Sequence, residues 1–270
     1  MPELPEVETV KNELAPHVVG QHVTDLTLFY EGIVREPSVK EFRTRLVCQQ
    51  ITGISRRAKY LLFQLGSGDV LVIHLKMSGA LLLQTPDKLE RYIRAIIHFD
   101  DSKKLYFRDP RKFARMMLVR DVTPILGRLG PEPLEPDFTP EVLAELLGKR
   151  KAPIKPVLLD QEFIAGLGNM YADEALFAAG ISPLRPANSL TKDEIKHLHM
   201  AIQKVLRLGI TNKGASEVTY FRPSGEMGKA FWDFKVAHRR GENCPVCGTP
   251  LVYLRLRGRG TYYCGKCQKG

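Results

Sequence analysis

The sequence has few cysteines, a single tryptophan and no long apolar run. No apolar stretch reaches the roughly 20 residues that a membrane-spanning helix needs, so we expect no such helix and no membrane partner. The first residues lack a basic segment followed by an apolar one, which predicts no secretory signal and a cytosolic chain. Internal repeats and low-complexity tracts are also missing.

Acidic residues are the scarcer charge. There are 30 Asp and Glu against 40 Lys and Arg, giving a formal net charge of +10. Such a surplus favours a polyanionic partner, with nucleic acid ahead of an anionic membrane surface, although a merely basic soluble protein stays open. With 270 residues, of which 44% are hydrophobic, the chain can build two modest domains or one larger domain with an appendage.

Four of the five cysteines are concentrated in the last 27 residues. They form two C-x2-C pairs with 16 residues between the pairs, the spacing of two knuckles that hold one zinc ion. The residues between the pairs predict a β-hairpin with Arg259 near its tip. A redox dithiol is the alternative, and two symmetric knuckles argue against it. The predicted zinc ligands are Cys244, Cys247, Cys264 and Cys267. The fifth cysteine, Cys48, lies in an apolar run and is predicted to be a small core residue.

The hydrophobic period changes along the chain. Residues 3–14 predict an amphipathic helix, and eight short strand-like runs between about residues 20 and 120 predict a β-sandwich or barrel. The proline-rich stretch "LGPEPLEPDFTPE" predicts a linker. Helices are then expected from Pro140, capped by Thr139, in "IKPVLLD", in "MYADEALFAAG", and from the capping box of Thr191 and Glu194 to Gly209.

This pattern predicts an α+β chain in three parts. The expected divisions are a β-rich domain at residues 1–128, a linker at 129–138, a helical domain at 139–235 and a small zinc-bound tail at 236–270. Each boundary follows a shift in composition or period.

Basic and glycine-rich loops supply candidate contacts for nucleic acid. Gly166 and Gly168 precede a helix, where free N–H groups bind phosphate, although a tight interhelical turn explains them equally well. The run "KRKAPIKP", with Arg150, Lys151 and Lys155, can line a DNA backbone or simply face solvent. Met77, Arg111 and Phe113 lie close to turns. Apolar wedges beside an arginine unstack bases in some proteins, although each of the three residues alone is more typical of core packing.

Together these segments resemble bacterial formamidopyrimidine-DNA glycosylases. The similarity rests on "MPELPEVET", "RRAKYLLF", "HLKMSG", "DPRKF", "LGPEPL", "IKPVLLDQ", "AGLGNMYADEALF" and the closing "GRGTYYC", in this order along nearly the whole chain. The resemblance implies an N-terminal β-sandwich, a helix-two-turn-helix domain and a zinc finger. It also implies base-excision repair of oxidised purines, chiefly 8-oxoguanine and formamidopyrimidines, in double-stranded DNA.

The resemblance also assigns the chemistry. Removal of Met1 leaves the secondary amine of Pro2 as the nucleophile, which expels the damaged base and forms a Schiff base with C1′. Glu3 is the implied general acid and base. Lys59 is implied in proton transfer, and Arg259 in the later elimination and in gripping phosphates. Strand scission by β- and then δ-elimination follows.

The remaining implied contacts lie on the DNA. Met77, Arg111 and Phe113 match the residues that fill the gap left by the flipped base. Lys155 and Asn169 match phosphate-contacting positions, and His74 is a weaker match of that kind.

Two segments depart from the family pattern. A His-Asp-His segment often precedes "DPRKF" in the family, whereas this chain has "ERYIRAIIHF", so Tyr92 or Arg94 is expected to take that DNA contact. The loop at 212–243 starts with "NKGAS" and ends with "VAHRR", in place of a paired glycine and "VYGR". In the family this loop covers the flipped base, so the departure bears on which lesion is preferred.

Other functions stay open. An endonuclease VIII-like enzyme for oxidised pyrimidines is disfavoured by "PELPE" in place of "PEGPE". A non-catalytic zinc-ribbon DNA-binding module would have no use for Pro2 and Glu3, and a zinc-stapled protein without a nucleic-acid role would show no steep salt dependence. We expect a monomer in the bacterial cytoplasm, associated with the nucleoid through DNA.

Overall fold

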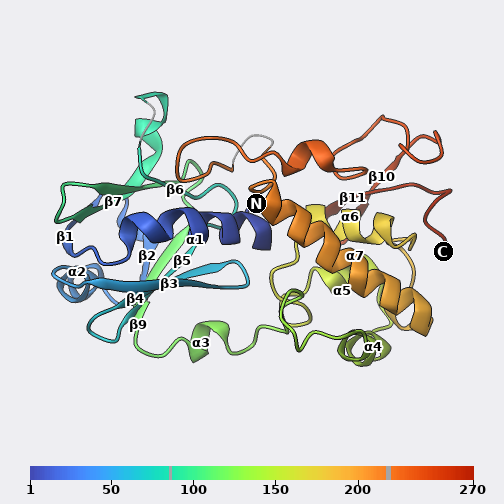
Figure 1. Ribbon diagram of the computed structural model, residues 1–270, viewed down its shortest axis with the longest axis horizontal. Coiled ribbons are helices and arrows are strands. Elements are labelled where there is room, and N and C mark those ends of the chain that lie inside the picture. Colours follow the sequence, from blue (N-terminus) through green and yellow to red (C-terminus); the bar gives the residue numbers. More distant parts are fainter. Residues whose placement is uncertain (85–86, 217–219) are drawn as a thin grey trace. The chain divides into compact units, whose positions relative to one another are not determined.

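A computed structural model describes residues 1–84, 87–216 and 220–270. The chain divides into two compact units (Figure 1). The first consists of Met1–Gly127 and Ile210–Phe231, and the second of Arg128–Gly209 and Trp232–Gly270. Among the described residues, no helix is both long enough and apolar enough to cross a membrane.

The first unit is a β-sandwich. Its four-stranded sheet has the order β1-β7-β8-β6, and its five-stranded sheet the order β2-β9-β5-β4-β3. Both sheets contribute to one hydrophobic core, which includes Leu26 and Phe107 from the first sheet and Phe63 and Ile73 from the second. Burial alternates along β7, as expected for a strand with one face on the core. The strands are β1 (Val23–Leu28), β2 (Val34–Glu36), β3 (Ile51–Arg57), β4 (Tyr60–Leu65), β5 (Val70–His74), β6 (Ala80–Leu82), β7 (Ile93–Phe99), β8 (Lys104–Arg108) and β9 (Arg115–Val119).

The N-terminal helix α1 (Leu4–Val18) confirms the expected amphipathic helix and extends it by one turn. Leu4, Val7, Val10, Leu14 and Val18 share its buried face, so the apolar spacing continues past the predicted end. Short helices complete this unit: η1 (Glu31–Ile33), η2 (Asp87–Tyr92) and α3 (Thr123–Leu126).

A second helix in this unit was not predicted. Helix α2 (Val39–Leu46) begins at Ser38, whose hydroxyl accepts a hydrogen bond from the Glu41 amide, and it buries Phe42. The Ser-x-x-Glu spacing was the available sequence signal. The prediction that Cys48 is a core residue is wrong. Cys48 is exposed and has a φ of 66°, because it lies in the turn between α2 and β3.

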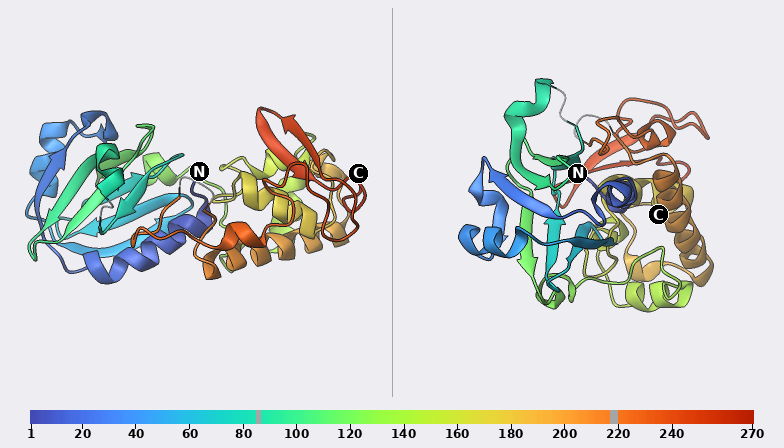
Figure 2. Two further views of the ribbon diagram at one scale, coloured as in Figure 1. Left: turned by 90° about the horizontal axis from the view of Figure 1, so that it is seen from above. Right: turned by 60° about the vertical axis from the view of Figure 1, so that its left-hand side comes forward.

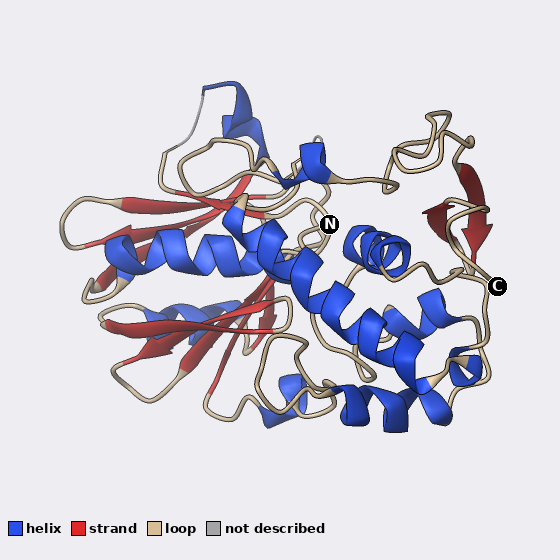
Figure 3. Cartoon of the chain, turned by 45° about the vertical axis from the view of Figure 1, so that its right-hand side comes forward, coloured by secondary structure: helices blue, strands red, loops and turns tan. Residues whose placement is uncertain are grey.

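The second unit is helical apart from one hairpin (Figures 2 and 3). The Thr139 cap is confirmed by its bond from the Val142 amide, and the capping box by reciprocal bonds between Thr191 and Glu194. The final helix runs past the predicted end at Gly209. The elements are α4 (Pro140–Gly148), α5 (Ile154–Leu158), α6 (Asn169–Ala178), η3 (Ala187–Ser189), α7 (Lys192–Thr211), η4 (Ala230–Asp233), β10 (Val252–Leu256) and β11 (Arg259–Tyr263).

Gly209 is a packing residue and not a helix stop. A Cβ atom at this position would lie 2.5 Å from the hydroxyl of Tyr171, which is fully buried. A Cβ at Gly148, the last residue of α4, would meet no atom within 4 Å.

We therefore predict opposite effects for the same substitution in two helices. Gly209→Ala should destabilise the protein by about 1–3 kcal/mol through overpacking against Tyr171. Gly148→Ala should be neutral or stabilise it by up to about 1 kcal/mol, because alanine favours helix. Thermal unfolding followed by circular dichroism measures both. A Gly209→Ala variant as stable as Gly148→Ala would contradict the packing role.

Candidate functional site

The start of α1 is held by buried polar contacts. Pro2 and Glu3 are both buried, and Glu3 is the N-cap residue of α1. The backbone amide of Glu3 donates to the Glu6 carboxylate at 2.7 Å, in the arrangement of a capping box. The positive end of the helix dipole lies at this position, which stabilises a carboxylate such as that of Glu3.

Lys59 lies on the two-residue turn between β3 and β4, and it is 5% exposed. Arg56 holds this turn, because its guanidinium donates to the Ala58 carbonyl at 2.9 Å and to Glu8 of α1 at 2.8 Å. Burial alone would raise the pKa of Glu8, but its bonds to Lys11 and Arg56 outweigh burial and lower it. The ion pair therefore ties the Lys59 turn to the helix that carries Glu3.

His74 is buried beside this turn. It pairs with Tyr60 across β4 and β5, and the two rings meet edge to face at 4.5 Å. Its Nδ1 accepts the Lys76 amide at 2.9 Å, which leaves the hydrogen on Nε2. Burial, together with the charges of Lys76 and Lys59, lowers the pKa of His74 to about 3. His74 is thus a neutral donor at physiological pH.

The three predicted wedge residues lie on two neighbouring loops. Met77 is 37% exposed after β5, and Phe113 is 43% exposed after β8, with Arg111 placed 4.9 Å above its ring. Asp109 joins these loops. Its carboxylate accepts the Ser78 hydroxyl at 2.5 Å, the Arg111 amide at 3.2 Å and the Ala114 amide at 2.7 Å. The structure therefore brings the wedge residues together. Asp109 was not predicted, although an Asp before a Pro is a signal for such a turn.

The segment that departs at "ERYIRAIIHF" lies against the same loop. The carbonyl oxygen of Tyr92 accepts a hydrogen bond from the Asp109 amide at 2.9 Å, and the guanidinium of Arg91 lies over the Tyr92 ring. Arg94 donates to the Asp109 carbonyl at 2.7 Å. Both candidate replacements are therefore attached to the backbone that leads into the wedge loop.

The loop after α7 is anchored on α1. Within the described residues, the Ala215 amide donates to Glu6 at 2.8 Å, and the buried Tyr220 hydroxyl donates to the Glu6 carbonyl at 3.4 Å. Arg222 forms an ion pair with Glu13 at 2.7 Å. Residues 217–219 of the loop at 212–243 lie outside the described residues.

In the second unit, the glycine turn precedes α6 as predicted. Gly166 has a φ of 91°, which favours glycine, and Gly168 is the N-cap residue. Asn169 begins the helix. Its buried Oδ1 accepts no hydrogen bond within the part of the chain that the structure describes.

Lys155 is buried, with 1% exposure. Its ammonium lies 2.7 Å from the Asp173 carboxylate and donates to the Gly260 carbonyl at 2.7 Å and the Thr261 hydroxyl at 3.0 Å. Asp173 also accepts the Tyr262 amide at 3.2 Å. Burial raises the pKa of Asp173 to about 7, although Lys155 favours its charged form. A phosphate would have to replace one of these partners, so contact between Lys155 and DNA stays a prediction.

The other cationic residues of this unit that the sequence predicts to contact DNA face solvent. Arg150 is half exposed and lies 3.5 Å from Asp160, and Lys151 is exposed. Arg259 is exposed and opens β11, directly after a two-residue turn in which Arg257 and Gly258 have positive φ. The hairpin with Arg259 near its tip is therefore present. Because Lys155 bonds Gly260, it fixes the strand that begins with Arg259.

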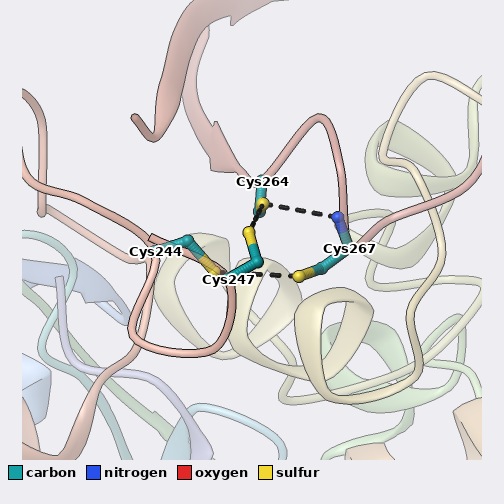
Figure 4. Close-up of side chains that lie close together, drawn as sticks. All are labelled: Cys244, Cys247, Cys264 and Cys267. Carbon is teal, nitrogen blue, oxygen red and sulfur yellow. Dashed lines mark hydrogen bonds between the residues drawn. The ribbon is translucent and has the colours of Figure 1, made fainter. Parts of the chain in front are cut away.

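The four cysteines of the second unit lie together (Figure 4). Their sulfur atoms are all within 4.8 Å of one another, with 3.8 Å between Cys244 and Cys267 and 3.4 Å between Cys247 and Cys264. A tetrahedron with Zn–S bonds of about 2.3 Å has sulfurs about 3.8 Å apart, so the four thiolates fit one zinc ion.

Comparison with known proteins covers almost the whole chain. The Formamidopyrimidine-DNA glycosylase N-terminal domain matches residues 1–116, its H2TH domain residues 129–220, and the zinc finger found in FPG and IleRS residues 241–270. The chain belongs to the formamidopyrimidine-DNA glycosylase family. It is an enzyme family, and the zinc finger together with the four clustered cysteines supports one structural zinc ion.

Relatives and solved structures agree with this assignment. The glycosylase of Geobacillus kaustophilus is 42% identical, with 100% of both chains covered, and that of Symbiobacterium thermophilum is 43% identical over 99% of this chain and 89% of its own. The MutM (Fpg) crystal structure from Thermus thermophilus has a TM-score of 0.90 at 38% identity, covering 99% of this chain and 98% of its own. A Lactococcus lactis Fpg variant in complex with Fapy-dG-containing DNA has a TM-score of 0.91 at 36% identity over 100% of both chains.

We predict that Cys264→Ser removes the zinc ion. Cys264 is fully buried, and three thiolates hold zinc less tightly than four. Metal analysis should give one zinc ion per chain for the wild type and less than one for the variant, with faster proteolysis of the hairpin. Cys48→Ser, the control at the exposed cysteine, should keep its zinc. Equal zinc content in both variants would contradict the site.

His74 generates a prediction about pH. In the unfolded chain its pKa is near 6.5, whereas burial lowers it to about 3 in the folded protein. Its contribution to stability is therefore complete above pH 6.5 and is lost as the pH falls toward 3. From pH 6.5 to 5.0, the free energy of unfolding should fall by up to about 2 kcal/mol more in the wild type than in His74→Gln. Urea unfolding measures this, and parallel pH dependences would show that His74 titrates normally.

Proposed function

We propose that this protein excises oxidised purines, 8-oxoguanine and formamidopyrimidines, from double-stranded DNA and then cleaves the strand at the resulting abasic site. The observation that carries the proposal is the start of α1. In a member of this glycosylase family, Pro2 and Glu3 lie buried at a capped helix N-terminus. The Lactococcus lactis structures with Fapy-dG-containing and abasic-site DNA support the same substrate class.

Pro2 acts as the nucleophile once Met1 has been removed. Its nitrogen is then a secondary amine, and α-amino groups titrate near about pH 8, so a useful fraction is unprotonated at neutral pH. The nitrogen forms a bond to C1′ as the glycosidic bond breaks, and the electron pair leaves with the base. The nitrogen then loses its proton, and the C1′–O4′ bond breaks with its electron pair going to O4′, which gives an iminium that withdraws electrons as lysine Schiff bases do. It acidifies the 2′ hydrogen, so that β-elimination and then δ-elimination expel the two phosphates.

Further residues move protons and hold the DNA. Glu3 exchanges protons with the opening sugar ring. Lys59, on the turn tied to α1 by Arg56 and Glu8, transfers protons and contacts the backbone. Arg259, on the strand fixed by Lys155, serves the last elimination and holds phosphates. The ring of His74 offers a neutral Nε2–H to the backbone.

The DNA-binding residues fill distinct roles. Met77, Arg111 and Phe113 occupy the gap left by the flipped base, and their exposure on loops joined by Asp109 suits them to insertion. Backbone contacts come from Tyr92, Arg150, Lys151, Lys155 and Asn169. For Asn169, support comes from its place as the first residue of α6, because the N-terminus of a helix favours a phosphate.

The proposed division of labour follows the expected domains. Residues 1–128 carry the chemistry, 139–235 hold the DNA and 236–270 form the zinc finger, with 129–138 as a linker. We propose that the protein acts as a monomer in the bacterial cytoplasm, on the nucleoid, where its DNA substrate is.

Borohydride trapping tests this function. Wild-type protein and Pro2→Gly are mixed with duplexes carrying 8-oxoguanine opposite cytosine or an abasic site, and covalent protein–DNA bands are quantified after reduction. We expect wild-type bands on both duplexes and at least a tenfold loss in the variant, which lacks the secondary amine. Mass spectrometry verifies that Met1 is gone.

The two duplexes separate the possible failures. Trapping on the abasic duplex alone would retain the lyase chemistry but reject 8-oxoguanine as the lesion. Without trapping on either duplex, in protein that lacks Met1, the catalytic proposal would fall and a DNA-binding module would replace it.

A further inference from the structure

Arg108 is a buried arginine without a hydrogen-bonding partner for part of its guanidinium. It is the last residue of β8, paired with Ala80 of β6 and Ile93 of β7, and it is 7% exposed. Its Nε and Nη1 are buried and have no hydrogen-bond acceptor within the described residues. Unmet donors of this kind are rare and costly in folded proteins.

Two aromatic rings hold the guanidinium. Its central carbon lies 5.4 Å from the centre of the Tyr92 ring and 5.0 Å from that of Phe221. Ring faces attract a cation, but they offer no acceptor to N–H groups that point outward in the guanidinium plane. The rings therefore hold the Arg108 guanidinium in place but leave its Nε–H and Nη1–H without an acceptor among the described residues.

No carboxylate among the described residues neutralises Arg108 by a direct bond. The adjacent Asp109 uses its carboxylate on Ser78, Arg111 and Ala114. Burial lowers the pKa of Arg108, which reflects the cost of its charge. Arg56 shows the usual solution: its side chain is also 7% exposed, but it forms an ion pair with Glu8 at 2.8 Å. Arg108 differs because two of its N–H donors, on Nε and Nη1, meet no acceptor among the described residues.

The position of Arg108 indicates which acceptor. It directly precedes Asp109, which joins the loops of Met77, Arg111 and Phe113. Its two rings come from the segments that depart from the family pattern, Tyr92 before β7 and Phe221 in the loop after α7. We propose that Arg108 is a substrate-contacting residue, which donates Nε–H and Nη1–H to an oxygen atom of the damaged DNA. This inference rests on the proposed function.

The oxygen acceptor has two possible sources. A carbonyl or formyl oxygen of the lesion would make Arg108 a determinant of base specificity. A phosphate oxygen beside the lesion would make it a determinant of affinity for any duplex, with a dependence on salt. The two sources differ in whether the contact survives on DNA that lacks the base.

The experiment compares Arg108→Met and Arg108→Lys with Arg120→Met. Arg120 has an 81% exposed side chain in the same unit, so its replacement removes one charge without touching the loops. Single-turnover excision is measured on an 8-oxoguanine duplex. Affinity is measured on a tetrahydrofuran abasic-analogue duplex between about 50 and 200 mM KCl, the range over which affinity that depends on phosphate contacts falls steeply with salt. Thermal unfolding by circular dichroism verifies that each variant is folded.

For a base oxygen, Arg108→Met should lower excision about 10- to 100-fold and leave affinity for the analogue within about twofold. For a phosphate oxygen, affinity for the analogue duplex should fall, and the salt slope of that affinity should decrease by about one contact. Arg108→Lys retains charge but not the planar fork, and should lose about tenfold in the same assay.

Arg108 variants that match Arg120→Met on both duplexes would overturn the proposal. If Arg108→Met is unfolded, Arg108→Lys alone decides on the same criteria. Wild-type trapping on the 8-oxoguanine and abasic duplexes separates this outcome from failure of the proposed function: an active wild type with unaffected Arg108 variants rejects only the role of Arg108.

Discussion

The start of α1, where the proposed catalytic residues Pro2 and Glu3 lie, depends on one buried carboxylate, that of Glu6. Its two oxygens accept the amides of Glu3 and Ala215, and its backbone carbonyl accepts the Tyr220 hydroxyl. The bonds of Ala215 and Tyr220 join residues more than 200 positions apart in the sequence, at the point where α1 begins. A buried acceptor left unpaired costs about 1–3 kcal/mol, so α1 and the loop after α7 stabilise each other's position. The position of Glu3 is thereby coupled to the segment that the family uses to cover the base.

The second unit solves a similar problem with two adjacent carboxylates on α6. Glu174 is buried and accepts the amides of Lys235, Val236 and Ala237, which lead into the zinc finger. Asp173 engages Lys155 and the Tyr262 amide of the zinc hairpin. Glu174 thus binds the segment that precedes the zinc hairpin. Asp173 and Lys155 bind strand β11 of the hairpin itself, so both segments are attached to α6. Zinc closes the hairpin, but these carboxylates determine the direction in which Arg259 is presented.

Local signals predicted much of the fold, and they failed where distant contacts decide. The Thr139 and Thr191 caps, the zinc knuckles and most strands follow from spacing alone, since each is set within a few residues. Cys48 was placed in the core because its neighbours are apolar, but a helix end turns it outward. Lys155 reads as part of a basic run, and only its distant partners, Asp173 and Thr261, show that it is buried. Glu6 was missed for the same reason, because the Ala215 amide that it accepts lies 209 positions away. Asp109 did have a local signal, its place before Pro110 at a turn.

The departures from the family pattern meet in space. Tyr92 stands in the segment where the family often has His-Asp-His, and Phe221 stands in the altered loop, 129 positions later; both rings lie against Arg108. Each ring face attracts the buried guanidinium, so both segments contribute to holding its charge. The two departures look unrelated in the sequence, but in the structure both segments contact the same arginine side chain. Since Arg94 also donates to the carbonyl of Asp109, the same cluster extends to the loop that carries Arg111 and Phe113, the residues proposed to fill the gap left by the flipped base.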